Sequence, residues 1–197
     1  MTLTIAYFPP IEYFALLARY SSVYMEACEN YQKQSYRNRC RIYAADGVQN
    51  LNFPIVHSGG SINIPIREVL VDYSVPWLEK TMRCIDTAYH SSPFFDYYRD
   101  SLYEVLCRRP ATLWELDMSI IRYFMQKIGL NTEIRLTVEY ASEHVDIHPK
   151  RPDSILAELG LDRPYYQVFS GKSGFIPNLS VMDLLFNEGP GSLDWLL

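Results

Sequence analysis

The fold class of the chain is indicated by residues 3–20, which read LTIAYFPPIEYFALLARY. Leu3–Phe8 is predicted to be a short strand, and it ends at two prolines, which lack the N–H that a sheet ladder needs. A helix is predicted over Glu12–Tyr20, where large apolar side chains recur at helical spacing. A strand that leads directly into a helix is a common beginning of an α/β layer.

Further strands are predicted downstream of this unit. Arg41–Ala45 and Val48–Val56 flank Asp46-Gly47, a strong turn dipeptide that predicts a hairpin. The other expected strands of the sheet are Ile66–Tyr73 and Asn131–Tyr140, and Val23–Glu26 is a further candidate strand.

Helices are predicted from apolar stripes, caps and breakers. They cover Leu78–Tyr89, Phe94–Arg108, Leu113–Ile128, Asp153–Leu159 and Leu179–Phe186, the last with Asn178 as its cap. The predicted fold is therefore α/β, or mixed α+β: a mixed sheet packed by several helices in a single domain over residues 1–197.

Composition and charge limit the classes of function. The 197 residues carry 18 Lys+Arg against 23 Asp+Glu, a net charge of −5, and 48% are hydrophobic. This acidic balance argues against a nucleic-acid surface, which needs clustered excess cations. The sequence predicts a cytoplasmic protein, because its four cysteines are far apart and it shows no signal-peptide pattern. It also has no apolar run long enough to span a membrane, so it is expected to lie outside the membrane.

The most basic stretch is NYQKQSYRNRCR, residues 30–41. If this stretch is extended, Arg37, Arg39 and Arg41 share one face, and their guanidinium groups can bind phosphate or carboxylate. The equally weighted alternative is a solvated edge strand whose charges oppose aggregation.

Two other local patterns are weaker. Gly171-Lys172-Ser173 resembles the end of a phosphate-binding loop, but Tyr166 stands where that motif needs glycine. The His144-x-Asp146-x-His148 pattern could face a divalent metal, although the neighbouring prolines favour an exposed polar loop. No metal site is therefore predicted, and the sequence identifies no cofactor.

Several short motifs occur in one order along the chain. They are Tyr7-Phe8-Pro9, Glu12-Tyr13-Phe14, Lys33, Asn38-Arg39, Trp77-x-x-Lys80, Tyr89, Tyr165-x-Gln167 and Phe175-x-Pro177-x-Leu179-Ser180-x-x-Asp183. This order resembles the WbqC-like family. The chain differs from the family pattern at its opening turn and in the region before Tyr165, which is shortened to Ser154–Pro164.

The resemblance implies a role in bacterial surface-polysaccharide, O-antigen-type biosynthesis, on a sugar nucleotide or related amino-sugar intermediate. Acyl or aminoacyl transfer is the reaction considered, and a non-catalytic binding or scaffold protein of the same pathway is the alternative.

The matching positions define the candidate site. On this reading the substrate-binding residues are Tyr7, Tyr13, Lys33, Asn38, Arg39, Trp77, Tyr89, Gln167 and Ser180. Asp183 is the candidate base and Lys80 a second cation near the reacting groups. Spacing alone also allows a structural reading in which Ser180 and Asp183 stabilise the start of the last helix. The expected partner is a small anionic ligand, and the sixteen tyrosines make a homodimer a reasonable expectation.

Overall fold

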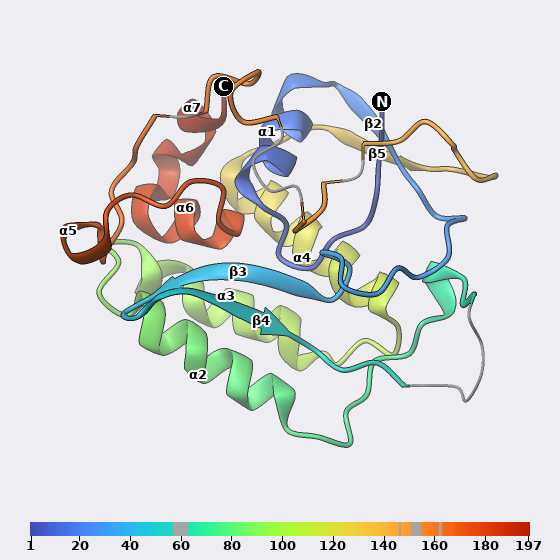
Figure 1. Ribbon diagram of the computed structural model, residues 1–197, viewed down its shortest axis with the longest axis horizontal. Coiled ribbons are helices and arrows are strands. Elements are labelled where there is room, and N and C mark those ends of the chain that lie inside the picture. Colours follow the sequence, from blue (N-terminus) through green and yellow to red (C-terminus); the bar gives the residue numbers. More distant parts are fainter. Residues whose placement is uncertain (57–62, 146, 151–154, 162) are drawn as a thin grey trace.

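A three-stranded parallel sheet joins the N-terminal part of the chain to residues beyond 130. The computed structural model describes residues 1–197 apart from 57–62, 146, 151–154 and 162 (Figure 1). The strands are β1 (Thr2–Leu3), β2 (Ser22–Met25) and β5 (Glu133–Leu136), in the order β1-β2-β5. Helix α1 (Ile11–Arg19) connects β1 to β2.

The hairpin forms as predicted but belongs to a sheet of its own. Strands β3 (Arg39–Ala44) and β4 (Gly47–Asn52) pair antiparallel, with Ala44 opposite Gly47. The expectation that this hairpin joins the N-terminal strand in one mixed sheet is wrong. The candidate strand at Val23–Glu26 is confirmed as β2, and the strand expected within Asn131–Tyr140 is confirmed as β5.

Two of the predicted strands differ from the structure. Ile66–Tyr73 begins with a short 3-10 helix, η1 (Ile66–Glu68), because the buried side chains of Ile66 and Val69 are three residues apart, which suits a helical turn. In Leu3–Phe8 only Leu3 belongs to β1, and the chain leaves the sheet before Phe8, whose φ is +42°.

Helix α4 (Leu113–Ile128) passes through the centre of the molecule (Figure 1), and it was predicted with the same bounds. Its first turn carries a capping box between Thr112 and Glu115, and its last turn ends at Gly129 with φ +88°. Two other helices, α2 (Trp77–Tyr89) and α3 (Phe95–Cys107), match the predicted helices within one or two residues.

The C-terminal part consists of short helices. These are α5 (Ser170–Ser173), α6 (Val181–Glu188), η2 (Gly189–Gly191) and α7 (Ser192–Leu196). Ser180 caps α6, so the prediction of Asn178 as the cap is wrong. Of the helix expected over Asp153–Leu159, residues 153–154 lie outside the described residues, and residues 155–160 form turns.

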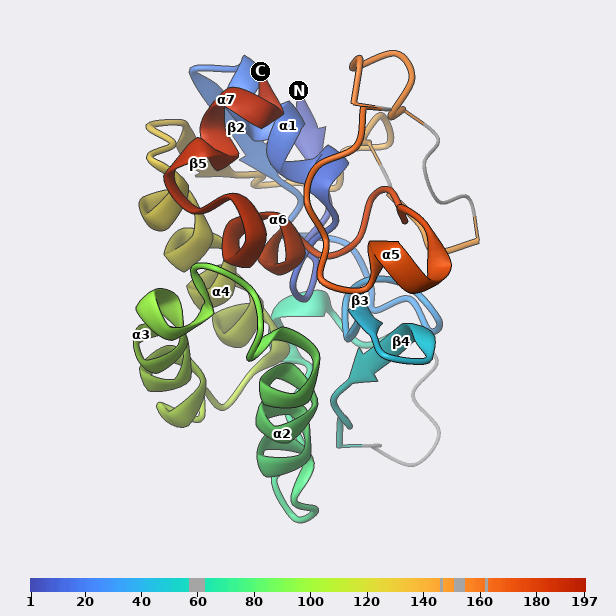
Figure 2. The same cartoon turned by 90° about the vertical axis from the view of Figure 1, so that its left-hand side faces the viewer.

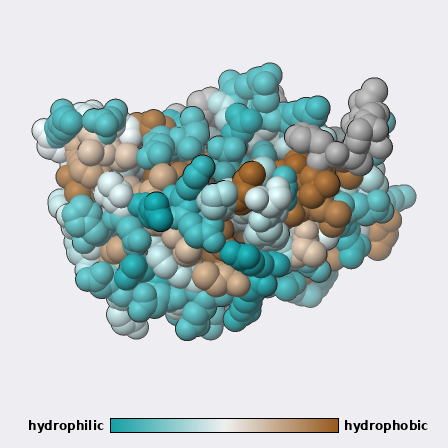
Figure 3. All heavy atoms as spheres, turned by 90° about the horizontal axis from the view of Figure 1, so that it is seen from below, coloured by the Kyte–Doolittle hydropathy of each residue, from teal (hydrophilic) through white to brown (hydrophobic). Residues whose placement is uncertain are grey.

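The other helices and the parallel sheet lie on two sides of α4 and α6. The parallel sheet, α1 and α7 lie at one end of the view in Figure 2, α2 and α3 lie at the other, and α6 lies between them. The face that carries α2 is largely hydrophilic, with separate apolar spots (Figure 3). Among the described residues, no helix is both long and apolar enough to cross a membrane.

Candidate functional site

Three segments that carry the sequence motifs meet beside β3. The backbone N–H of Ser180 donates to the Arg41 carbonyl at 2.9 Å, and that of Val181 donates to the Pro9 carbonyl at 2.9 Å. The Tyr7 N–H donates to the carbonyl of Tyr36 at 2.8 Å. The meeting segments are residues 7–12, 36–41 and 178–183, and together they are called the junction below. The start of α1, strand β3 and the start of α6 are thus held together by main-chain bonds.

Residues of the junction carry buried polar atoms that have no hydrogen-bond partner in the described part of the chain. Arg39 Nε, Arg41 Nη1 and Asn178 Nδ2 are buried, and none of them has a hydrogen-bond partner among the described residues. The Asn178 side chain is oriented by its other atom, because Oδ1 accepts from the Glu12 N–H at 3.0 Å. Asn38 Oδ1, an acceptor, is also buried without a described partner. An unsatisfied buried polar atom costs about 1–3 kcal/mol, so this set favours a ligand that offers acceptor oxygens to the three donors and a donor such as a hydroxyl to Asn38.

The expected three-arginine face is reduced to two residues. Arg39 and Arg41 alternate along β3 and share a face, as predicted. Arg37 lies before the strand, in a turn, and its guanidinium donates to the Glu29 carboxylate at 2.7 Å with both side chains buried. The strand begins only at Arg39, and the positive charge of Arg37 is matched by Glu29, so the prediction that Arg37 belongs to this face is wrong.

A second buried group surrounds Asp183 on α6. Its carboxylate accepts hydrogen bonds from the Tyr165 hydroxyl at 2.5 Å and from Gln167 Nε2 at 2.9 Å. Gln167 also bonds the Ile176 main chain in both directions, so it fixes the segment before α6 against Asp183. The Tyr89 hydroxyl lies against the same carboxylate. Three predicted site residues, Asp183, Gln167 and Tyr89, therefore lie together with Tyr165. These four residues are called the Asp183 cluster below.

The environment of Asp183 raises the pKa of its carboxyl toward neutral pH. Burial raises the pKa of this carboxyl to about 6, and the hydrogen bonds from Tyr165 and Gln167 oppose the shift. A carboxyl with this pKa changes protonation near neutral pH, which is a property of general acids and bases.

Phe53 brings three other predicted residues together. Its ring lies 4.8 Å from the Tyr7 ring and 5.4 Å from the Trp77 ring, and its carbonyl accepts from Asn38 Nδ2 at 3.0 Å. Tyr7 and Trp77 are buried, so their rings form core contacts in this structure. Sequence reasoning missed Phe53, because it follows β4 in a segment that carries no motif.

Asp117 is a further buried polar residue that sequence reasoning missed. It lies in α4, is fully buried, and neither carboxylate oxygen has a hydrogen-bond partner among the described residues. Burial raises the pKa of this carboxyl well above its ordinary value, although the positive charge of Arg37 opposes the shift. The sequence carries a signal for this residue, because Asp117 is a charged residue on the apolar helix face that Leu113, Leu116 and Ile120 define.

The remaining predicted residues lie apart from these groups or have structural partners. The Tyr13 hydroxyl donates to the Thr4 carbonyl at 3.1 Å inside the core, and Ser180 accepts from the Met182 N–H at 3.3 Å. Lys33 and Lys80 are exposed. No described contact joins Lys80 to Asp183. Of the His144-x-Asp146-x-His148 pattern, Asp146 lies outside the described residues.

Comparison with known proteins establishes the family. A sequence model described as the WbqC-like protein family matches residues 6–162. The chain belongs to this family. The uncharacterized protein Rv1507c of Mycobacterium tuberculosis is similar to it, with 25% identity over an alignment of 221 positions that covers 96% of this chain and 94% of the relative. No solved structure matches the chain.

The family match covers a part of each of the two buried groups. In this WbqC-like protein the matched range includes residues 7–12 and 36–41 of the junction and also Asp117. It ends before Tyr165, so Tyr165, Gln167 and Asp183 of the Asp183 cluster lie beyond it, whereas Tyr89 lies inside it. The arginines of β3 therefore lie inside the matched range.

Proposed function

We propose that this WbqC-like protein is a cytoplasmic enzyme of bacterial surface-polysaccharide biosynthesis that acts on a sugar nucleotide or a related amino-sugar intermediate. The observation that carries the proposal is the set of buried, unpartnered donors of Arg39, Arg41 and Asn178 at the junction. Phosphate and carboxylate oxygens are the acceptors that guanidinium groups bind best, often through two parallel bonds. A nucleoside diphosphate sugar offers such oxygens together with hydroxyls.

The proposed reaction is acyl or aminoacyl transfer to a sugar amine. In it the amine nitrogen attacks the acyl carbonyl of a thioester or ester donor, the bond from that carbonyl to the donor sulfur or oxygen breaks, and the donor leaves as a thiolate or alkoxide. Asp183 takes the amine proton, and its pKa of about 6 suits a base that works near neutral pH. Asp183 is 1% exposed, so the substrate reaches it only if some of the residues that cover it move. Lys80 would supply a second cation. Its exposed position on α2 gives it weaker support than Asp183.

A ligand screen tests the binding part of the proposal. Thermal unfolding is followed with UDP-, dTDP- and GDP-sugars, the free nucleoside diphosphates and acyl-CoA. A ligand at 100 times its Kd adds about 2.7 kcal/mol of stability, which gives a clear shift in Tm. The variant Arg39→Gln should lose the shift, and the matched control Arg83→Gln should keep it, because Arg83 is exposed on α2. A shift that survives Arg39→Gln, or no shift with any sugar nucleotide, contradicts the proposal.

A non-catalytic binding or scaffold role is the second candidate. It is supported by the structural partners of several motif residues, such as Ser180 at the start of α6 and Gln167 on the Ile176 main chain. Mass spectrometry of an amino-sugar nucleotide incubated with acyl-CoA, and separately with an aminoacyl donor, distinguishes the two roles. A product mass from wild type that Asp183→Asn does not form supports the enzyme. Binding without any product supports the scaffold.

A further inference from the structure

Strand β5 has a free edge in the described part of the chain. It pairs with β2 on one side, where the Glu133 N–H donates to the Ser21 carbonyl at 2.9 Å and the Thr137 N–H to the Met25 carbonyl at 3.1 Å. In a parallel pair, alternate residues direct both main-chain groups to the same neighbour. The N–H and C=O groups of Ile134 and Leu136 therefore point away from β2, and no described strand pairs with them.

Three apolar side chains on or near β5 are exposed. Leu136 is 39% exposed and Val138 is 95% exposed, and Tyr24 of the adjacent strand β2 is 43% exposed. The unpaired main-chain groups of an edge strand offer a template on which another strand can pair. The strand lies at the margin of the molecule in Figure 2, where another chain can approach it.

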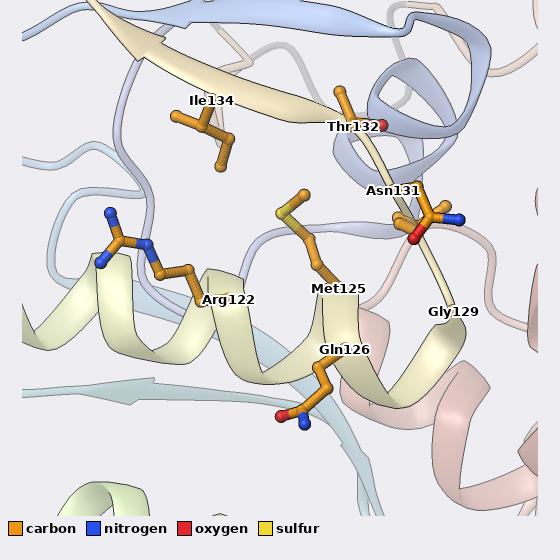
Figure 4. A pocket seen from close by; sticks show the side chains of 8 residues that line it. Arg122, Met125, Gln126, Gly129, Asn131, Thr132 and Ile134 are labelled. Carbon is orange, nitrogen blue, oxygen red and sulfur yellow. The ribbon is translucent and has the colours of Figure 1, made fainter.

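A groove follows the same edge. It has a volume of about 420 Å³ and is lined by residues of α4, by the loop after it and by β5. Figure 4 shows the Ile134 side chain directed from β5 toward α4, where Arg122 and Met125 face the same space. A strand added to β5 would direct alternate side chains into this groove. The groove lining includes none of the predicted site residues, so it is separate from the junction.

Charge restricts how a second copy can pair here. Glu133 and Arg135 lie on the opposite face from Ile134, and their side chains form an exposed ion pair at 2.7 Å. In a two-fold antiparallel pairing, only residues with outward main-chain groups form the hydrogen-bonded pairs. The residue on the two-fold axis lies opposite the same residue of the partner. If that residue were Glu133 or Arg135, two like charges would face each other. A centre at Leu136 would place Glu133 opposite the partner's Glu139.

With Ile134 on the two-fold axis, the residue at the axis has outward main-chain groups and no like charges face each other. It sets Glu133 opposite the partner's Arg135, and Arg135 opposite the partner's Glu133. Ile134 then exchanges two main-chain hydrogen bonds with the same residue of the partner. Leu136 lies opposite the partner's Thr132, which lines the groove, so each copy places an apolar side chain over the groove of the other.

We propose that two copies of this chain form a two-fold dimer through antiparallel pairing of their β5 strands, centred on Ile134, which joins two three-stranded sheets into one of six strands. The self-complementary order of Glu133, Ile134 and Arg135, the outward main-chain groups and the adjacent groove all favour a second copy as the occupant. An isologous contact of this kind closes on itself and leaves no free β5 edge.

Charge variants test this register directly. Sedimentation velocity of wild type should show a concentration-dependent dimer. Glu133→Arg gives four positive charges at the contact, and Arg135→Glu gives four negative ones, so each variant should raise the dimer Kd at least about tenfold. An equimolar mixture of the two variants should recover the dimer, because opposite charges then face each other at every position. Arg99→Glu on α3 is the control and should leave the Kd unchanged.

Hydrogen exchange provides an independent measurement. The Ile134 and Leu136 amides should gain protection as the protein concentration rises, while the Arg135 amide, which faces β2, should be protected at all concentrations. A monomer at every concentration overturns the proposal. A dimer that survives both charge variants, or whose Ile134 amide stays unprotected, also overturns it, because such a dimer uses another surface.

Discussion

The Tyr165 hydroxyl donates a hydrogen bond of 2.5 Å to the Asp183 carboxylate, and both side chains are buried. This contact joins α6 to the segment before α5, because Gln167 donates to the same carboxylate and also bonds the Ile176 main chain. The carboxylate thus organises the C-terminal part of the chain. Any change in its protonation is expected to affect stability.

The first prediction concerns pH and Asp183. Burial raises the pKa of its carboxyl to about 6 from 3.8. Between these pH values the folded chain keeps the proton and the unfolded chain releases it. The free energy of unfolding therefore falls as pH rises through this window, by up to roughly 3 kcal/mol. Asp183→Asn removes this dependence. Urea unfolding at pH 4, 5, 6 and 7 should show wild type losing stability relative to the variant, and a constant difference would contradict the prediction.

Tyr165→Phe provides the second prediction at the same site. It removes a hydrogen bond that lowers the pKa of Asp183, so the pKa should rise above 6. The loss of stability with rising pH should then continue to higher pH than in wild type. The same urea series checks this, with Tyr97→Phe as the control because Tyr97 is exposed on α3. An unchanged pH window in Tyr165→Phe would show that this bond does not set the pKa.

The third prediction concerns the buried ion pair of Arg37 and Glu29. Arg37→Met removes the guanidinium that bonds the buried carboxylate and should cost about 3–5 kcal/mol of unfolding free energy. Arg99→Met removes a partly exposed pair with Asp86 and should cost less than about 1 kcal/mol. Guanidinium denaturation of both variants makes the comparison. If the two variants lost similar amounts of unfolding free energy, the burial of the Arg37–Glu29 pair would not increase its contribution to stability.

Local signals predicted α2, α3 and α4 well because the causes of these helices lie close together in the sequence. The apolar stripe of Leu113–Ile128 and the glycine after it determine both ends of α4. The β5 strand was found from its alternation, and the hairpin from Asp46-Gly47. Each of these elements depends on neighbours within a few residues, so the chain itself carries the information.

Long-range relationships could not be derived in the same way. That the hairpin forms a separate sheet depends on where α2 and α6 pack, which no local pattern specifies. The convergence of Gln167, Tyr89 and Asp183 joins elements nearly 100 residues apart, and only the family resemblance pointed to all three. Lys33 and Lys80 were chosen on the same basis, and they are exposed.

The fourth prediction concerns Gly189, whose φ is +54°. A Cβ at this position would lie 2.5 Å from Cγ of the Phe94 ring, so Gly189→Ala combines backbone strain with a clash and should cost about 2–4 kcal/mol. Gly191→Ala is the matched control two residues on, because the nearest atom to its added Cβ is 4.0 Å away. Its effect should stay within about 0.5 kcal/mol. Thermal unfolding of the two variants separates these outcomes, and a neutral Gly189→Ala would contradict the close contact with Phe94.

The fifth prediction concerns the start of α4. Thr112 accepts from the Glu115 N–H at 3.2 Å, so Thr112→Ala should reduce the free energy of unfolding by about 1 kcal/mol. Thr87→Ala on the exposed face of α2 should be neutral or slightly stabilising, because alanine has the higher helix propensity. Urea unfolding of the two variants makes the comparison. Equal effects of the two changes would mean that the capping box does not contribute.

The separation of β2 from β5 along the chain affects how the protein is made. Ser22–Met25 leaves the ribosome roughly a hundred residues before Glu133–Leu136. At about 5–20 residues per second, β2 stays without its second neighbour for roughly 5–20 s, while β3, β4, α2, α3 and α4 are synthesised. During translation, therefore, the hairpin and the three helices can fold before β5 pairs with β2, and the parallel sheet is completed only after most of the chain has been synthesised.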